Sequence, residues 1–113
     1  MDNHRGRKNI SSVIPENSVV VIDCITLWLT NFYTDTKYDV LASLALAKEQ
    51  LNALKKLDST LIIIISNEIG MGLHADSEIG RKFTELQGWI NQDLAKISDR
   101  ATFMVSGLAL QLK

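Results

Sequence analysis

The sequence is poor in several features that define particular classes of protein. Its 113 residues contain a single cysteine, Cys24, which excludes a disulfide within the chain and favours a reducing cytosol. The formal net charge is −1, so no strongly basic surface is expected for nucleic acid or an anionic membrane. The longest apolar run, residues 61–65, is far too short to span a bilayer. We therefore expect a cytoplasmic protein that binds neither nucleic acid nor membranes.

The remaining composition fits one globular domain. Hydrophobic residues make up 46% of the chain and charged residues 22%, and the length allows one hydrophobic core but not two. The only proline, Pro15, lies in a polar N-terminal stretch without the apolar segment of a signal peptide. We expect residues 1–18 to form a polar N-terminal arm and residues 19–113 to form one α/β domain.

Three short apolar runs predict β-strands. Residues 19–22 and 61–65 consist of valine, isoleucine and leucine, and residues 101–105 form a weaker run of the same kind. Because these runs are apolar on both faces, they are typical of a parallel sheet that helices cover on both sides.

Helices are predicted between the runs, where apolar residues recur at spacings of three and four. One such stripe consists of Val40, Leu44, Ala47, Leu51 and Leu54, and the other of Ile79, Phe83, Leu86, Ile90, Leu94 and Ile97. A shorter helix is expected from Ile25 to Tyr33. The order β-α-β-α-β predicts an α/β fold with a parallel sheet and right-handed crossovers.

Polar residues follow each of the three apolar runs. They are Asp23-Cys24, Ser66-Asn67-Glu68 and Ser106-Gly107. Ligands of open parallel sheets bind beyond the carboxyl ends of the strands. We therefore expect the three groups to meet at one edge of the sheet.

Asp23 and Glu68 are the candidate catalytic residues at this edge. An aspartate that closes an apolar strand is typical of the residue that holds Mg²⁺, directly or through water, in phosphate-loop enzymes. The alternative is an aspartate that caps the next helix. With Glu68 at a neighbouring strand end, two carboxylates would suit a metal ion or a general base, whereas the alternative for Asn67 and Glu68 is the start of a solvated loop.

Glycines indicate two further features. Gly70 and Gly72 give backbone freedom to a loop that approaches or covers a ligand, although neither GxxxxGK[ST] nor GxGxxG occurs in the chain. Gly88 lies with Arg81 and Gln92 on the outer face of the second long helix, where glycine costs roughly 1 kcal/mol relative to alanine. It indicates close approach by another helix, another subunit or a ligand.

Four segments together resemble one enzyme family, the bifunctional adenosylcobinamide kinase / adenosylcobinamide-phosphate guanylyltransferase. Residues 19–31 resemble its segment VVxDCxTLWLTN, and residues 66–72 its (T/S)NEVGxG. Residues 81–92 are similar to RxFRDxxGxxNQ, and Val105-Ser106-Gly107 follows in the same order. The resemblance implies a P-loop NTPase-like (RecA-like) three-layer fold.

The resemblance also implies an activity in cobalamin biosynthesis. Family members phosphorylate adenosylcobinamide with ATP or GTP, then transfer GMP from GTP through a guanylylated histidine to give adenosylcobinamide-GDP, and they act as oligomers. By this resemblance Asp23 acts at the Mg²⁺–nucleotide site and Glu68 lies in the same cleft. The residues expected to bind substrate or nucleotide are Asn67, Gly70, Gly72, Arg81, Asn91 and Gln92.

The chain departs from the family pattern at its start. The glycine-rich GGxRSGKS loop is missing, so we expect an N-terminally truncated domain that is impaired in turnover. His4 precedes Arg5-Gly6-Arg7 and is the candidate for the guanylylated histidine, although the family's following tryptophan and glutamate are absent; the alternative is part of a basic, disordered start. The same core would also fit a non-catalytic remnant or interaction module, or a chain whose phosphate loop a separate chain supplies.

Overall fold

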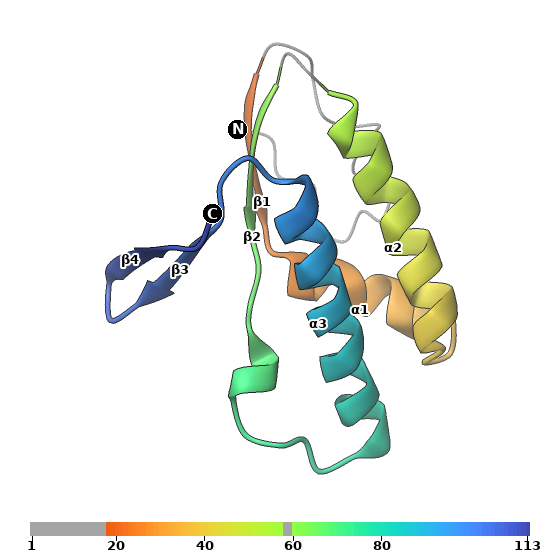
Figure 1. Ribbon diagram of the computed structural model, residues 1–113. Coiled ribbons are helices and arrows are strands. Elements are labelled where there is room, and N and C mark those ends of the chain that lie inside the picture. The colour runs from red at the N-terminus through yellow and green to blue at the C-terminus, as the bar shows by residue number, and fades with distance from the viewer. Residues whose placement is uncertain (1–17, 58–59) are drawn as a thin grey trace.

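The computed structural model describes residues 18–57 and 60–113. The elements follow in the order β1 (Val19–Asp23), α1 (Ile25–Asp35), α2 (Val40–Lys55), β2 (Leu61–Ile65), the 3₁₀ turn η2 (Ile69–Met71), α3 (Glu78–Ile97), β3 (Thr102–Val105) and β4 (Leu108–Gln111) (Figure 1). The three predicted helices are confirmed, and each begins within one residue of the first residue of its apolar stripe or expected range. The predicted arm, residues 1–18, lies outside the described residues except for Ser18. No helix in the described ranges is long and apolar enough to cross a membrane.

Strands β1 and β2 form a parallel pair, as predicted. The register runs from Val19 opposite Leu61 to Asp23 opposite Ile65, so the two carboxyl ends lie side by side. The connection between them contains α1 and α2, which supplies the length that a parallel crossover needs. This pairing is the structural basis of the candidate site.

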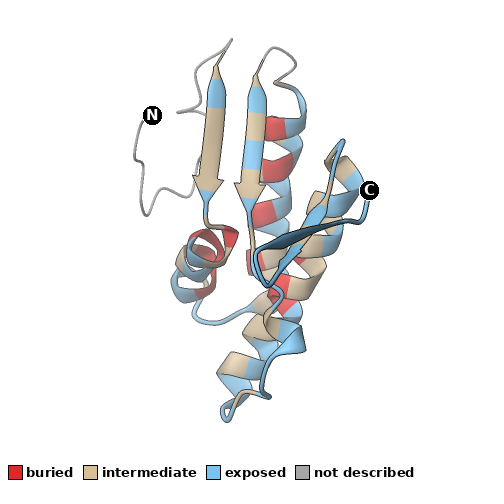
Figure 2. Cartoon of the chain, turned by 90° about the vertical axis from the view of Figure 1, so that its left-hand side faces the viewer, coloured by how far each residue is buried: buried red, intermediate tan, exposed pale blue. Residues whose placement is uncertain are grey.

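Helices cover only one face of this sheet in the part of the chain that the structure describes. Ile62 and Ile64 are half-buried and pack against the helical core, whereas Leu61, Ile63 and Ile65 are 59%, 45% and 42% exposed. Figure 2 shows the strands in front of the helices, with their outer face open. The expected three-layer arrangement is therefore not present among these residues. An apolar run indicates that both faces can be buried, but does not say what covers them.

The hydrophobic core lies between the three helices and the covered face of the sheet. Its fully buried members include Ile25 and Leu29 of α1, Ala47 of α2, and Leu86 and Ile90 of α3. Burial of a side chain of the size of leucine or isoleucine contributes roughly 1.5–3 kcal/mol. The two core stripes predicted from the spacing are therefore confirmed at Ala47, Leu86 and Ile90.

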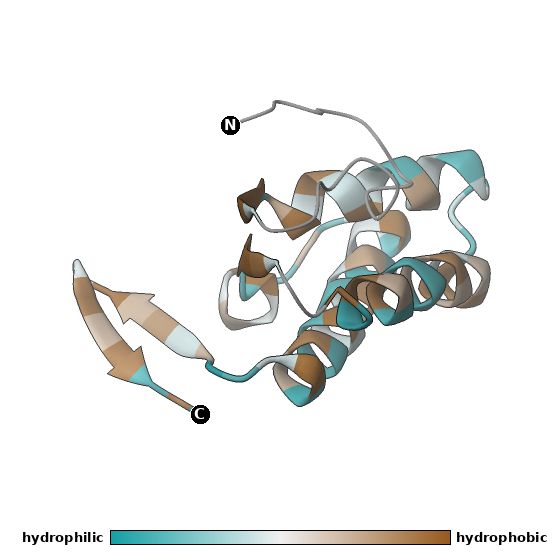
Figure 3. Cartoon of the chain, turned by 90° about the horizontal axis from the view of Figure 1, so that it is seen from above, coloured by the Kyte–Doolittle hydropathy of each residue, from teal (hydrophilic) through white to brown (hydrophobic). Residues whose placement is uncertain are grey.

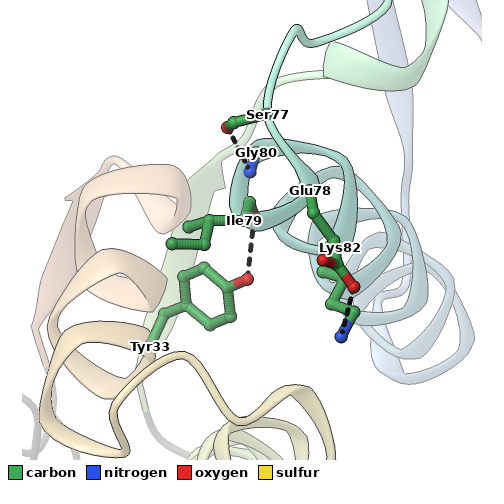
Figure 4. Close-up of polar contacts among 6 residues, drawn as sticks. All are labelled: Tyr33, Ser77, Glu78, Ile79, Gly80 and Lys82. Carbon is green, nitrogen blue, oxygen red and sulfur yellow. Dashed lines mark hydrogen bonds and ion pairs between the residues drawn. The ribbon is translucent and has the colours of Figure 1, made fainter.

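The first turn of α3 departs from the predicted stripe. Ile79 was expected in the core but is 47% exposed. Its main-chain carbonyl instead accepts a hydrogen bond of 2.8 Å from the hydroxyl of Tyr33, which is itself buried (Figure 4). Ser77 caps the same helix end by accepting a hydrogen bond of 3.0 Å from the main-chain nitrogen of Gly80.

The third apolar run does not join the parallel sheet, contrary to the prediction. Strand β3 pairs antiparallel with β4 in a separate two-stranded sheet. Ser106 and Gly107 have φ angles of 53° and 75°, the left-handed values that a two-residue hairpin turn requires. They therefore form the tip of a hairpin and do not lie at the edge with Asp23. Figure 3 shows this largely hydrophobic hairpin standing apart from the helices.

Candidate functional site

The carboxyl ends of β1 and β2 bring two predicted catalytic residues to one edge. Asp23 is the last residue of β1 and is exposed. Glu68 follows β2 by three residues, is also exposed, and stands immediately before the turn η2. Because the strands are parallel and in register, the two strand ends that lead to these carboxylates lie at the same rim, as predicted.

A buried glutamine of α3 connects this rim to the helical layer. Gln87 is 1% exposed, and its side-chain nitrogen donates to the Ser66 hydroxyl oxygen at 3.0 Å and to Asn91 Oδ1 at 3.1 Å. The Ser66 hydroxyl in turn donates to the same Asn91 oxygen at 2.5 Å. The carbonyl end of the Asn91 side chain therefore accepts two hydrogen bonds from inside the protein.

The other end of the Asn91 side chain holds the loop that begins after β2. Its nitrogen Nδ2 donates to the main-chain carbonyl of Asn67 and to Glu68 Oε1, both at 2.9 Å. The side-chain nitrogen of Asn67 donates to the Thr26 hydroxyl oxygen at 2.9 Å, which ties the same segment to the first turn of α1. The end of β2 is thus fixed from two helices.

These contacts give Asn91 a different role from the one that the resemblance implied. Asn91 was expected to bind substrate or nucleotide, but both ends of its amide group are engaged by protein atoms. It lies beside Glu68, so the structure does bring it to the predicted site. Its observed contacts are those of a residue that orients Glu68 and the backbone at Asn67.

The loop after Glu68 encloses a cavity of about 70 Å³ whose lining includes Gly70, Gly72, His74 and Arg81. The guanidinium of Arg81 donates to the main-chain carbonyls of Ala75 and Asp76, each at 3.2 Å, and thereby braces the loop. A Cβ at Gly70 would lie 3.8 Å from Thr84 and one at Gly72 would lie 3.4 Å from the Ile69 carbonyl, so no contact with a described residue forces glycine at either position. Their expected role towards a ligand stays a prediction.

Gln92 does not lie in this network. It lines a separate groove of about 270 Å³ between α2 and α3, together with Leu44, Lys48 and Trp89. At the nearby Gly88, an added Cβ would meet no atom within 4 Å among the described residues. The close approach that Gly88 indicated is therefore not made by another described helix of this chain.

His4 lies outside the described residues. Cys24 is half-buried and precedes α1 without a side-chain capping bond. Within residues 18–57 and 60–113, no group of three or more histidine, cysteine, aspartate or glutamate side chains could hold a metal ion.

Sequence reasoning missed Gln87 and the hydrogen-bonding role of Ser66. Gln87 adjoins Leu86 in the core stripe and precedes Asn91 by one helical turn, so both face inward. A polar side chain at an inward position needs a hydrogen-bond partner, and the polar segment 66–68 at the end of the strand β2 could supply one. An inward glutamine together with this polar strand end was the available signal in the sequence.

Polar side chains beyond adjacent parallel strands, held by helices, define an α/β protein of the class that binds ligands at this edge of the sheet. Comparison with known families identifies the particular one: the model described as cobinamide kinase / cobinamide phosphate guanyltransferase matches residues 3–112. The chain belongs to this family. The resemblance found in residues 19–31, 66–72 and 81–92 is thereby confirmed.

Similar proteins carry related names. The chain is 37% identical to the bifunctional adenosylcobalamin biosynthesis protein CobP of Pseudomonas aeruginosa, over 83% of this chain and 53% of that protein. It is 28% identical to the bifunctional adenosylcobalamin biosynthesis protein CobU of Escherichia coli and 23% identical to that of Salmonella typhimurium, each over 92% of this chain and 63% of the relative. The chain thus spans between about half and two thirds of the length of these relatives.

Proposed function

We propose that the chain acts in cobalamin biosynthesis, in the phosphorylation of adenosylcobinamide and the transfer of GMP from GTP to the product. Membership of the cobinamide kinase / cobinamide phosphate guanyltransferase family supports this proposal. The observation that carries it is the parallel pairing of β1 and β2, which sets Asp23 and Glu68 at one rim. Corrinoid and purine nucleotide are the proposed ligands.

In this proposal the two carboxylates have different roles. Mg²⁺ keeps several waters and is held by one or two carboxylates plus substrate phosphates, and the exposed Asp23 carboxylate fits that pattern. When bound, the ion would neutralise phosphate charge. Glu68, held by Asn91 through one oxygen, would accept the proton of the attacking hydroxyl.

The nucleotide phosphates need specific binding groups in the proposed site. A Mg²⁺–nucleotide site needs backbone N–H groups and a lysine around the phosphates, and neither GxxxxGK[ST] nor GxGxxG occurs in the 113 residues. We therefore propose that the chain by itself binds GTP or ATP weakly and turns over little, whatever its affinity for the corrinoid.

Self-association is proposed as well. Leu61 and Ile63 on the open face of the sheet, and Met104, Leu108 and Leu110 of the hairpin, are all between 45% and 73% exposed. Exposed apolar patches of this kind mark interaction surfaces. A homo-oligomer would cover such surfaces, and Gly88 offers a second face for close approach.

Titration calorimetry with cobinamide tests the functional proposal. Saturable binding to the chain, weakened by Glu68→Gln, is expected. No binding over a wide concentration range would favour the alternative, a non-catalytic module with the same core. The substitution Glu85→Gln is the matched control, because Glu85 is an exposed carboxylate of the same helix α3 that carries Asn91.

A further inference from the structure

The amide group of Asn91 can face Glu68 in two ways, and only one is favourable. With the nitrogen outward, it donates to the Asn67 carbonyl and to Glu68 Oε1. Rotated by half a turn, the side chain would set its own carbonyl oxygen against these two acceptors. A group that fixes the direction of this amide therefore decides whether Glu68 is held or repelled.

We propose that Gln87 is a positioning residue that acts on Glu68 through Ser66 and Asn91. Gln87 Nε2 donates to the Ser66 hydroxyl oxygen and to Asn91 Oδ1. Since the Ser66 hydroxyl oxygen accepts from Gln87, its own hydrogen is directed to Asn91 Oδ1, as observed. Two donors thus meet the Asn91 carbonyl from inside, and the Asn91 nitrogen must face outward.

The burial of Gln87 argues for this role over a purely structural one. Its side-chain carbonyl Oε1 is buried and has no hydrogen-bond partner among the described residues. A buried acceptor without a partner destabilises a fold, and methionine would fill a similar volume without it. What methionine cannot supply is the pair of donated hydrogen bonds, which is what orients Asn91.

The consequence for Glu68 is a division of its two oxygens. Oε1 is held by Asn91, and Oε2 has no hydrogen-bond partner within the described part of the chain. Glu68 is exposed, so Oε2 is the oxygen available to accept a proton or a hydrogen bond from a ligand. The inference rests on the proposed function in this one respect: it takes Glu68 as a group that faces the substrate.

The test is nuclear magnetic resonance of the full 113-residue chain, without ligand. In the wild type we expect a cross-peak between the Asn91 side-chain amide protons and the Glu68 Hγ protons. Gln87→Met should abolish that cross-peak, because the Asn91 amide loses its preferred direction, while the chain stays folded. Gln92→Met, an exposed position on the same helix in the separate groove, should leave the cross-peak in place.

Ser66→Ala tests the same inference by an independent route and decides the matter if Gln87→Met fails to fold. Loss or marked weakening of the cross-peak supports the positioning role. A cross-peak of wild-type intensity in a folded Gln87→Met or Ser66→Ala chain overturns it.

Failure of the proposed function would look different. Adding cobinamide to the wild-type chain should shift the Glu68 Hγ resonance. If cobinamide leaves that resonance unchanged while Gln87→Met still removes the cross-peak, the positioning role stands and the substrate assignment is wrong. If cobinamide shifts the resonance but the cross-peak survives Gln87→Met, the positioning role alone is wrong.

Discussion

Asn91 on α3 holds Glu68 at the end of β2 through a hydrogen bond of 2.9 Å from Nδ2 to Oε1. The two residues are 23 positions apart in the sequence, and the helix α3 lies against the loop that carries Glu68 (Figure 1). This contact joins the hydrogen-bonded interior, where Gln87 and Ser66 meet Asn91, to the exposed rim where the proposed chemistry takes place.

Replacing Asn91 should weaken the fold measurably. Asn91→Ala removes the acceptor of the Ser66 hydroxyl, one of the two acceptors of the Gln87 nitrogen and the donor to Glu68 at once. We expect the free energy of unfolding to fall by about 1–3 kcal/mol, measured by urea denaturation. Asn52→Ala, an exposed position of α2, is the matched control and should change the value by less than about 0.5 kcal/mol. Equal effects of the two substitutions would contradict the network.

The buried hydroxyl of Tyr33 gives the fold a dependence on high pH. Burial raises the pKa of Tyr33 above its ordinary value of 10.0, since the charged form is poorly solvated there, and Lys82 opposes this. Above about pH 10 the unfolded chain loses the proton before the folded chain does, so stability falls as the pH rises through that range. Below it, the contribution is fully present.

Tyr33→Phe isolates this effect. It removes the hydrogen bond to the Ile79 carbonyl and should lower stability near neutral pH by about 0.5–1.5 kcal/mol. It should also flatten the fall in melting temperature above about pH 10. Tyr38→Phe is the control, because Tyr38 is 47% exposed and packs edge-on against Tyr33 without this hydrogen bond. An unchanged alkaline profile in Tyr33→Phe would contradict the assignment.

A substitution at Gly88 should affect the stability of the single chain and its self-association in opposite directions. Since an added Cβ would meet nothing within 4 Å in the described chain, Gly88→Ala should stabilise the monomer by about 0.5–1 kcal/mol through helix propensity. If this face forms part of a homo-oligomer, the same substitution should shift sedimentation towards smaller species. Gly107→Ala is the contrast: with φ at 75°, it should destabilise the hairpin. A stabilised variant that associates like the wild type would remove Gly88 from the interface.

The sequence predicted the helical body well because its signals are local. Spacings of three and four located α2 and α3, and the unbroken runs at 19–22 and 61–65 located the strands of a parallel pair, whose long connection suits a crossover. The third run was misassigned because its polar successor, Ser106-Gly107, is a turn dipeptide between two strands. The short apolar segment after it, residues 108–110, was the missing half of the hairpin signal.

The sequence predicted the residues at the exposed rim of the candidate site, but not the hydrogen bonds in the interior that hold them. Asp23 and Glu68 follow from strand polarity alone, whereas the direction of the Asn91 amide depends on Gln87 and Ser66, which are 21 positions apart. Hydrogen bonds between residues far apart in the sequence produce no periodic sequence pattern. Coordinates are therefore needed to tell a residue that could bind a ligand from one that positions a neighbouring side chain.

The most direct test of the account asks whether the ends of β1 and β2 form one ligand-binding rim. Mn²⁺ prefers the same carboxylate and water ligands as Mg²⁺ and broadens the resonances of nearby nuclei. With Mn²⁺ added to the 113-residue chain, we expect the signals of residues 23–26 and 66–68 to broaden together, and Asp23→Asn to restore both sets. Broadening confined to one strand end, or unaffected by Asp23→Asn, would contradict the account.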